Sequence, residues 1–251
     1  MIHVNSLSVG SRLLPLSFDV NQGEILHVIG PNGSGKSTLL AAVAGLLDFD
    51  GQAQIFEQDV ASSSIELLAT CRAFLCQSDR PAFNLDVVQY LALSLPTHID
   101  SHSPELESVI TELSQLLEVD DKLHRSIHHL SGGEWQRVRL CAICLQIWPT
   151  LNPYAKLLIL DEPAAPLDIG QETLLYKLIR RVADMGISVI MSNHDLNRTL
   201  KHADKALLLE QGVLQRVGEV KDVLSVEELS RVFKTKVTKA EVEGSPVLLF
   251  D

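Results

Sequence analysis

The chain has 251 residues, of which 46% are hydrophobic, so it is long enough to bury a sizeable core in one or two compact units. The 32 acidic residues outnumber the 21 basic ones, which gives a formal net charge of −11. This balance argues against independent binding to nucleic acid, which needs clustered Lys and Arg, and against direct attachment to an anionic membrane surface. Any membrane contact is therefore expected to run through a protein partner.

The first ten residues contain no basic region followed by an apolar run, and no apolar stretch approaches the roughly 20 residues that span a bilayer. We therefore expect a soluble chain in a reducing, cytoplasmic compartment. Cys141 and Cys144 have the spacing of a metal or redox pair. However, Val138, Cys141, Ala142 and Leu145 follow helical spacing, and no set of His or Cys partners flanks them. This pattern favours burial in a core.

In chain order, the apolar pattern predicts β-strands that alternate with α-helices. Short apolar runs predict strands over 25–29, 72–77, 156–161 and 187–192. Apolar residues at helical spacing predict helices over 37–47 and 168–185. Because strand, helix and strand follow one another, we expect right-handed crossovers and a mainly parallel sheet in an α/β fold.

Between these elements, the segment 86–145 lacks strand signals and predicts consecutive helices, including one over 104–117. We expect this segment to be a helical subdomain that is inserted into one domain spanning 1–251.

The C-terminal part, 206–251, predicts a β-hairpin around Gln211-Gly212. A short helix over 226–233 and further strand-like sequence follow. We expect this part to form a C-terminal hairpin and tail.

The strand 25–29 runs into a glycine-rich loop with the pattern G-x-x-x-x-G-K-[ST], which a helix follows. The glycines let backbone N–H groups turn toward phosphate oxygens, and the helix N-terminus favours an anion. Lys36 can reach the β- and γ-phosphates, and the Ser37 hydroxyl can bind Mg²⁺. The predicted ATP-binding residues in and after this loop are Gly30, Pro31, Asn32, Gly33, Ser34, Gly35, Lys36, Ser37 and Thr38.

A second apolar strand ends in two adjacent carboxylates, Asp161 and Glu162. Charged groups at the end of a buried strand require cationic partners, because an uncompensated buried charge is unfavourable. Asp161 is placed to hold Mg²⁺, and Glu162 is placed to polarise the attacking water as general base.

With these motifs in place, the segment Ser131-Gly132-Gly133-Glu134 resembles the signature of ABC ATPases. Three further matches follow the order of that family: Gln77 resembles the glutamine of its Q-loop, 165–168 its D-loop, and His194 its switch histidine. The resemblance covers about nine-tenths of the chain. It implies a mainly parallel core sheet, N-terminal antiparallel strands and an inserted helical subdomain. It also implies that Gln77 joins Ser37 and Asp161 at the metal, and that Gln77 and His194 assist Glu162.

The resemblance further implies that two copies of the chain pair head to tail. The signature residues Ser131, Gly132, Gly133 and Glu134 of one copy would then bind the γ-phosphate held by the other copy. ATP would close this homodimer and hydrolysis would release it.

One departure from the family pattern concerns the residue that contacts the adenine base. ABC ATPases usually carry an aromatic residue before the phosphate loop, whereas the corresponding segment here is Ser11-Arg12-Leu13-Leu14. Arg12 either stacks its guanidinium plane on adenine or is a solvated surface residue.

Within the family, several segments are similar to the ATPase subunits of bacterial cobalamin (vitamin B12) importers. These are the aromatic-free segment around Arg12, the run 132–140, the linker 148–154 and the run 192–197. This similarity implies two membrane-spanning permease subunits, a periplasmic binding protein that acts indirectly, and a place on the cytoplasmic face of the inner membrane. An ATPase of an iron–siderophore or haem importer, or a soluble iron–sulfur assembly ATPase, is the alternative.

The loop that follows Gln77 contains an aromatic residue, Phe83. Either Phe83 is incidentally exposed, or it lines a groove that receives a cytoplasmic helix of the permease, as the family resemblance implies.

Overall fold

The computed structural model describes residues 1–76, 80–96, 99–100 and 103–251. Its main sheet has six strands in the order β10-β9-β3-β8-β7-β6. Neighbouring strands are parallel, except that β10 is antiparallel to β9. The strands are β3 (Ile25–Ile29), β6 (Arg72–Leu75), β7 (Leu157–Leu160), β8 (Ser188–Ser192), β9 (Lys205–Glu210) and β10 (Val213–Glu219).

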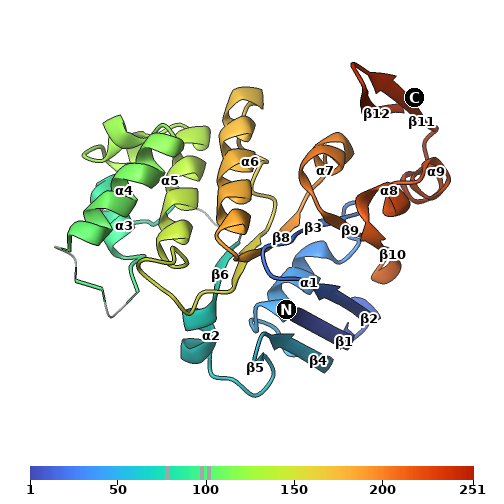
Figure 1. Ribbon diagram of the computed structural model, residues 1–251, viewed down its shortest axis with the longest axis horizontal. Helices are drawn as coiled ribbons and strands as arrows, with labels where there is room; N and C mark the ends of the chain where they lie inside the picture. Colours follow the sequence, from blue (N-terminus) through green and yellow to red (C-terminus); the bar gives the residue numbers. More distant parts are fainter. Residues whose placement is uncertain (77–79, 97–98, 101–102) are drawn as a thin grey trace.

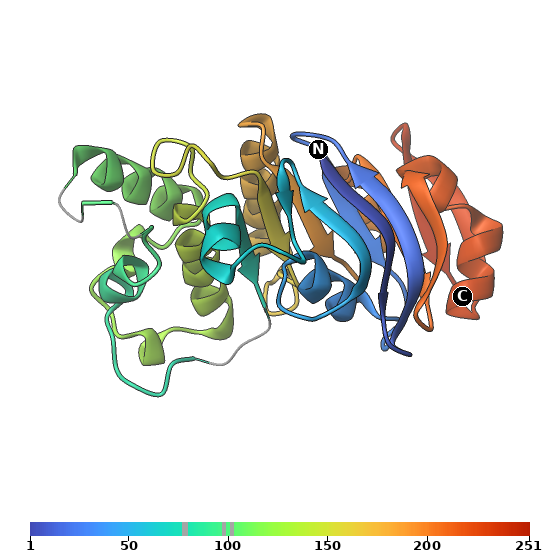
Figure 2. The same cartoon turned by 90° about the horizontal axis from the view of Figure 1, so that it is seen from below.

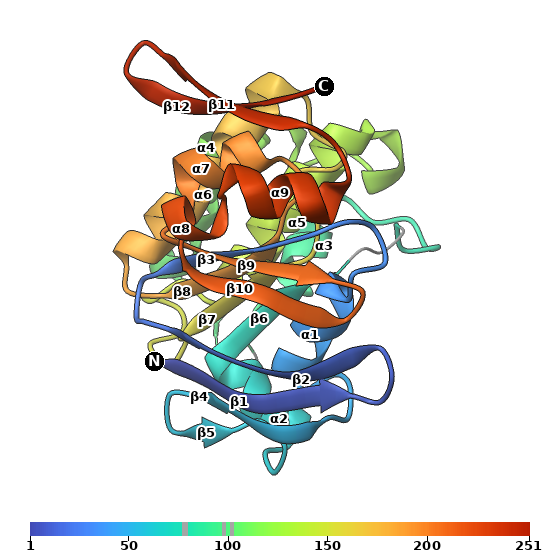
Figure 3. The same ribbon diagram turned by 90° about the vertical axis from the view of Figure 1, so that its right-hand side faces the viewer.

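A second, antiparallel sheet has the strand order β2-β1-β4-β5. It lies below the main sheet in Figure 3, beside helix α1 (Lys36–Val43). Its strands are β1 (Ile2–Val9), β2 (Leu13–Val20), β4 (Asp50–Ile55) and β5 (Gln58–Asp59). One buried apolar cluster joins residues of this sheet, α1 and one face of the main sheet. The phosphate loop between β3 and α1 therefore rests on a core that both sheets share.

The opposite face of the main sheet packs against helices. Along β7, Leu157 and Ile159 belong to the cluster with α1, whereas Leu158 and Leu160 belong to the cluster with α5 (Gly132–Leu145) and α6 (Ile169–Asp184). All four side chains are buried, as expected for a parallel strand that is covered on both faces. The continuous apolar run thus reflects a strand covered on one face by α1 and the antiparallel sheet, and on the other face by α5 and α6.

The described part of 86–145 is helical (Figures 1 and 2). After α2 (Ile65–Cys71) and β6, it contains α3 (Val87–Ala92), α4 (Pro104–Leu116), two 3₁₀ turns, η1 (Asp120–Lys122) and η2 (Ile127–His129), and α5. These helices lie at one end of the molecule, and the C-terminal elements lie at the other end.

The C-terminal elements pack around a third buried cluster. They are α7 (Leu196–His202), the β9–β10 hairpin, α8 (Val220–Val223), α9 (Val226–Phe233) and a separate two-stranded sheet of β11 (Val237–Val242) and β12 (Ser245–Phe250). The predicted hairpin and the helix over 226–233 are confirmed. Gln211 and Gly212 both have positive φ, as a two-residue hairpin turn of type I′ requires.

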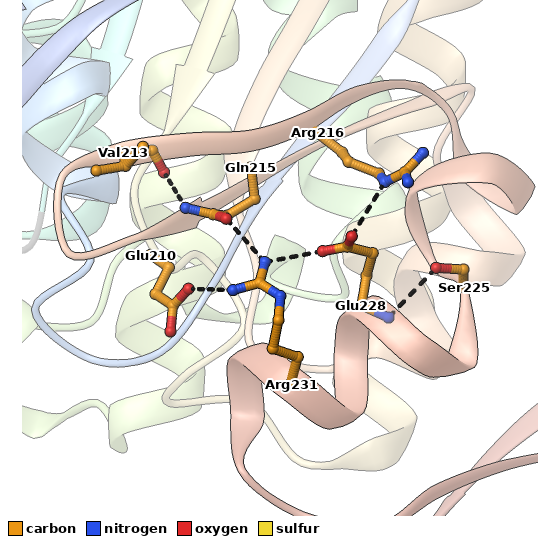
Figure 4. A network of polar contacts seen from close by, with 7 residues as sticks. All are labelled: Glu210, Val213, Gln215, Arg216, Ser225, Glu228 and Arg231. Carbon is orange, nitrogen blue, oxygen red and sulfur yellow. Dashed lines mark hydrogen bonds and ion pairs between the residues drawn. The ribbon is translucent and has the colours of Figure 1, made fainter.

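A charged network joins α9 to this hairpin (Figure 4). The Arg231 guanidinium donates to a Glu210 carboxylate oxygen at 2.9 Å, to Gln215 Oε1 at 2.7 Å and to Glu228 at 2.8 Å. Glu228 also pairs with Arg216 at 3.6 Å. One cation on α9 therefore ties together both strands of the hairpin.

Two predicted boundaries differ from the structure by two residues or more. The helix predicted over 37–47 ends at Val43, because Gly45 adopts φ +71° and the chain closes with bonds from Gly45 N to Ala42 O and from Leu46 N to Ala41 O. This left-handed glycine closure satisfies the last helical carbonyls and stops the helix. The strand predicted over 72–77 ends at Leu75.

The cysteine pair is part of the core, as predicted. Cys141 and Cys144 are fully buried on α5, and burial raises the pKa of the Cys141 thiol to about 12. Burial also raises the pKa of Cys144. The described residues include no cluster of His, Cys, Asp and Glu that would hold a metal ion. Among the same residues, no helix is both long and apolar enough to cross a membrane.

Candidate nucleotide site

The phosphate loop, residues 30–37, depends on glycine at three positions. Gly30, Gly33 and Gly35 have φ of +147°, +75° and +103°. A Cβ on Gly30 would lie 2.1 Å from the backbone oxygen of Leu209. Both the backbone conformation and the close approach of β9 therefore exclude a side chain at Gly30.

The N-terminus of α1 is open to an anion. Its N-cap residue is Gly35, and in this described stretch no side chain caps the helix and no acidic residue occupies its first turn. The Ser34 hydroxyl is buried and has no hydrogen-bond partner among the described residues. Unsatisfied donors and a positive helix dipole at one place fit a phosphate group.

Lys36 lies over the loop, 5% exposed, and its ammonium group donates to the backbone oxygens of Gly30 at 2.9 Å and Pro31 at 3.1 Å. Burial lowers the pKa of Lys36, while Glu162 and Asp161 oppose this effect. The opposition indicates that the two carboxylates at the end of β7 lie near the Lys36 charge.

These residues surround a cavity of about 650 Å³. Its lining contains Glu162, most of the loop and three residues from elsewhere in the chain, Ser11, Arg12 and Gln211. Arg12 belongs to the β1–β2 turn, and Gln211 belongs to the β9–β10 turn. The lining residues are Ser11, Arg12, Asn32, Gly33, Ser34, Gly35, Lys36, Ser37, Thr38, Glu162 and Gln211.

Gly212 holds these two turns against the phosphate loop. Its N–H donates to Ser34 O at 3.0 Å, and its carbonyl accepts from Leu14 N at 2.8 Å. A Cβ at Gly212 would lie 2.6 Å from Arg12 O. The position of Arg12 relative to the loop is therefore fixed by backbone contacts.

At the end of β7, Glu162 adopts φ +47°, a left-handed conformation that costs a residue other than glycine about 1–3 kcal/mol. Its carboxylate accepts a hydrogen bond from His194 Nε2, which lies 2.5 Å from Glu162 Oε1. The structure thus brings together two of the predicted site residues. The neighbouring Asp161 is 7% exposed, and its Oδ1 accepts from the Ser192 hydroxyl at 2.7 Å.

The donor set fits Mg²⁺, because a carboxylate and a hydroxyl supply the oxygen ligands that this ion prefers. Asp161 stands at the strand end, and Ser37 lines the same cavity as Glu162. Gln77, the third predicted ligand and a predicted assistant of Glu162, lies outside the described residues.

The signature segment occupies the N-terminus of α5. Ser131 caps this helix: its Oγ accepts from Glu134 N at 3.2 Å, and Glu134 Oε2 accepts from Ser131 N at 2.7 Å. A Cβ on Gly132 would meet no atom within 4 Å, whereas one on Gly133 would lie 2.1 Å from Gln171 Oε1. Among the described residues that line the cavity, none belongs to 131–134.

Sequence analysis did not select Ser11, Gln211 or Ser192 for this site. Gln211 was placed only in a hairpin turn, and its approach to the phosphate loop depends on pairing between β9 and β3, which are distant in sequence. Ser192 was placed only in a strand, although Ser at the C-terminal end of a parallel strand beside an acidic strand end is a usable signal.

Comparison with known proteins agrees with this geometry. The family model described as ABC transporter matches residues 13–165, which contain the phosphate loop, the signature and the acidic strand end. The chain belongs to the ABC transporter family. It is an ATP-binding subunit of that family, with ATPase activity coupled to transport.

Two curated relatives match over their full length. The chain is 62% identical to the vitamin B12 import ATP-binding protein BtuD of Vibrio atlanticus (strain LGP32), and 60% identical to the protein of the same name from Vibrio cholerae (strain M66-2). Each alignment covers 100% of both chains.

Solved structures share the fold. One described as the ATP-binding subunit of an ABC transporter superposes with a TM-score of 0.77 at 24% identity, and the match covers 93% of each chain. The ADP conformation of MJ1267, an ATP-binding cassette of an ABC transporter, superposes with a TM-score of 0.75 at 22% identity, covering 93% of this chain and 98% of that one. The predicted α/β fold is confirmed.

Proposed function

We propose that this site hydrolyses ATP with Glu162 as the general base. The observation that carries the proposal is the contact of 2.5 Å between Glu162 and His194 at the edge of the cavity that Lys36 enters. His194 holds the carboxylate in place, so that Glu162 can accept a proton from the attacking water. Lys36, the loop N–H groups and the Ser34 hydroxyl bind the phosphates.

In this proposal Ser37, Asp161 and Gln77 hold Mg²⁺, which neutralises phosphate charge when bound. Arg12 borders the cavity from an exposed turn, where its guanidinium plane stacks on the base in place of the usual aromatic residue. The remaining predicted ATP-binding residues, Gly30, Pro31, Asn32, Gly33, Gly35 and Thr38, surround the phosphates through backbone and side-chain contacts.

The signature acts in trans. Ser131, Gly132, Gly133 and Glu134 do not line the cavity of their own chain in its described part, so a head-to-tail homodimer is needed to bring them to a γ-phosphate. The open space around Gly132 leaves its helix N-terminus accessible to a second copy. We further propose one domain over 1–251, with 86–145 as an inserted helical subdomain and 206–251 as a C-terminal hairpin and tail.

The cargo we propose is cobalamin (vitamin B12), imported through two membrane-spanning permease subunits and supplied by a periplasmic binding protein. The ATPase would then lie on the cytoplasmic face of the inner membrane, held there by the permease. Relatives at 60% and 62% identity over the full chain are named as vitamin B12 import ATP-binding proteins, which supports this cargo.

Reconstitution tests the cargo directly. The chain is co-purified with candidate permease subunits, placed in vesicles and assayed for ATP-dependent uptake of radiolabelled cobalamin. Uptake that requires an intact Glu162 is the expected result. Uptake of an iron–siderophore or haem instead of cobalamin would contradict the proposed cargo. Co-purification with soluble iron–sulfur assembly proteins rather than a permease would contradict transport.

Phe83 is 60% exposed, as the proposed permease contact requires. Replacing Phe83 with Asp should leave ATP binding intact and reduce co-purification with the permease, because a charge replaces an aromatic anchor. Leu93, 68% exposed at the C-terminal end of the following helix α3, offers a matched control, Leu93→Asp. Normal assembly and transport by the Phe83 variant would show that Phe83 is not part of the permease contact.

A further inference from the structure

Ser192 is the last residue of β8, and its side chain is 1% exposed. The hydroxyl donates to Asp161 Oδ1 at 2.7 Å and accepts from the backbone N–H of Glu162, also at 2.7 Å. One buried hydroxyl therefore contacts both adjacent acidic residues at the end of β7. It bonds the carboxylate of one and the backbone of the other.

Strand pairing explains this placement. In the register between β7 and β8, Leu160 lies opposite Met191, so the next residue on each strand, Asp161 and Ser192, continues the pair. Neither residue is near the other in sequence. The contact therefore depends on the parallel sheet rather than on a local motif.

The bond to the Glu162 N–H matters because of the backbone conformation there. Glu162 has φ +47°, which a residue with a side chain rarely adopts unless its surroundings hold it. Ser192 holds the backbone of Glu162, and His194 contacts its carboxylate at 2.5 Å. Ser192 and His194 thus restrain the proposed general base, Glu162, at its backbone and at its carboxylate.

We propose that Ser192 is a positioning residue that couples the metal carboxylate to the general base. This inference rests on the proposed roles of Asp161 and Glu162. The hydroxyl occupies one lone pair of Asp161 Oδ1 and thereby fixes the rotation of the carboxylate, so that its remaining lone pairs face one direction. The same hydroxyl fixes the peptide from which the Glu162 side chain projects.

Removal of the hydroxyl has two expected effects. Asp161 becomes free to rotate, which weakens divalent-ion binding by about tenfold to a hundredfold, as is typical for the loss of a hydrogen bond to a metal ligand. The Glu162 N–H loses its partner, so the base is less well placed and kcat falls. Nucleotide binding through the phosphate loop should change little.

The test uses the full chain with a non-hydrolysable ATP analogue, and Mn²⁺ affinity is measured by electron paramagnetic resonance. Ser192→Ala is compared with Ser192→Thr, which retains the hydroxyl, and with Ser188→Ala as a matched control. Ser188 is fully buried on the same strand, and its hydroxyl donates to Asn21 O at 2.9 Å, away from the carboxylates. If the Ala variant does not fold, Ser192→Cys supplies a side chain of similar size with a weak donor.

We expect Ser192→Ala, or the Cys variant, to lose about tenfold to a hundredfold in Mn²⁺ affinity. The Thr variant and Ser188→Ala should stay near the wild type. Unchanged Mn²⁺ affinity in Ser192→Ala would overturn the inference, and so would an equal loss in Ser188→Ala. If the wild-type chain itself binds no Mn²⁺ with the analogue, the proposed function has failed instead.

Discussion

The two helix N-termini that are assigned to phosphate differ in how they are satisfied within their own chain. At α1 the cap is Gly35, no side chain of the described residues caps the helix, and the cavity around it contains Lys36 and Glu162. At α5 the cap is Ser131, and its capping box with Glu134 already occupies donors of the first turn. The first terminus lacks only a ligand. The second has its Ser131 and Glu134 N–H groups bonded by the capping box, and it borders no nucleotide cavity in the described part of its chain.

This difference teaches that the two termini perform unequal tasks. In the proposed site the α1 terminus binds phosphate, because no side chain of the described residues caps its N–H donors. The α5 terminus is partly satisfied by its own capping box, and we propose that the open space at Gly132 receives the nucleotide held by a second copy. We therefore propose that one subunit carries two half-sites and that a complete site requires two subunits.

The largest expected effect tests the half-site around the N-terminus of α1. Glu162→Gln should lower steady-state ATP hydrolysis by about 100-fold to 10,000-fold and leave ATP binding intact, because the amide is nearly isosteric but cannot accept the proton. Turnover and nucleotide binding are measured on the same preparation, with Glu112→Gln as control, since Glu112 pairs on the surface with Arg181. Hydrolysis near the wild-type rate would exclude Glu162 as base.

A pair of glycine variants compares the termini directly. Gly30→Ala should destabilise the chain by about 2–3 kcal/mol, because its Cβ meets Leu209 O and φ is +147°. Gly132→Ala, at the first position of α5, should be neutral or stabilise by up to about 1 kcal/mol, because its Cβ meets no atom within 4 Å. Urea unfolding measures both. Equal destabilisation would show that Gly132 has a structural role in its own chain.

The next prediction concerns the positive charge of Lys36 in the half-site around α1. Lys36→Ala should weaken ATP binding by about tenfold to a hundredfold, since a charge-assisted hydrogen bond to phosphate is lost. Lys177→Ala, which removes an exposed lysine from α6, serves as control. A fluorescent ATP analogue measures the dissociation constants. Equal affinity in wild type and Lys36→Ala would remove Lys36 from the phosphate site.

The smallest effect concerns the strand that enters the phosphate loop. His27 on β3 is fully buried, and burial lowers its pKa to about 3, with a smaller contribution from the His202 charge. Because the unfolded state takes up a proton below pH 6.5 and the folded state does not, stability is complete above pH 6.5 and is lost as the pH falls toward 3.

We therefore expect His27 to contribute a loss of at most about 1.4 kcal/mol in unfolding free energy for each pH unit between pH 6 and 4. His27→Asn removes this proton, so urea unfolding of the variant should depend less steeply on pH in that window. Identical slopes would contradict the assignment of a neutral, buried His27.

Local motifs predicted much of the molecule. The phosphate loop was predictable because its glycines, lysine and serine are contiguous, and the run 157–160 was predictable because burial on both faces requires continuous apolar residues. The end of α1 was missed, although Gly45 carried a usable stop signal.

The remaining site contacts depend on pairing between segments that are distant in sequence. Gln211 reaches the cavity because Gly212 bonds Ser34, and Ser192 reaches Asp161 because β7 and β8 pair in register. No short pattern contains both partners of either contact. The direct contact between His194 and Glu162 likewise required the assembled sheet, even though both residues had been selected from sequence.

The central claim is that a complete site takes the phosphate loop from one subunit and the signature from another. Mixing decides it. Lys36→Ala and Gly132→Asp subunits are assayed at an ATP concentration at which each is inactive as the sole ATPase. They are then combined with the permease, and complexes that contain one of each are isolated by two different tags. One composite site in such a complex is intact and the other carries both defects. We predict that ATPase activity returns at up to about half of the wild-type level, from one working site of two. Complete inactivity in complexes of verified mixed composition would contradict the account.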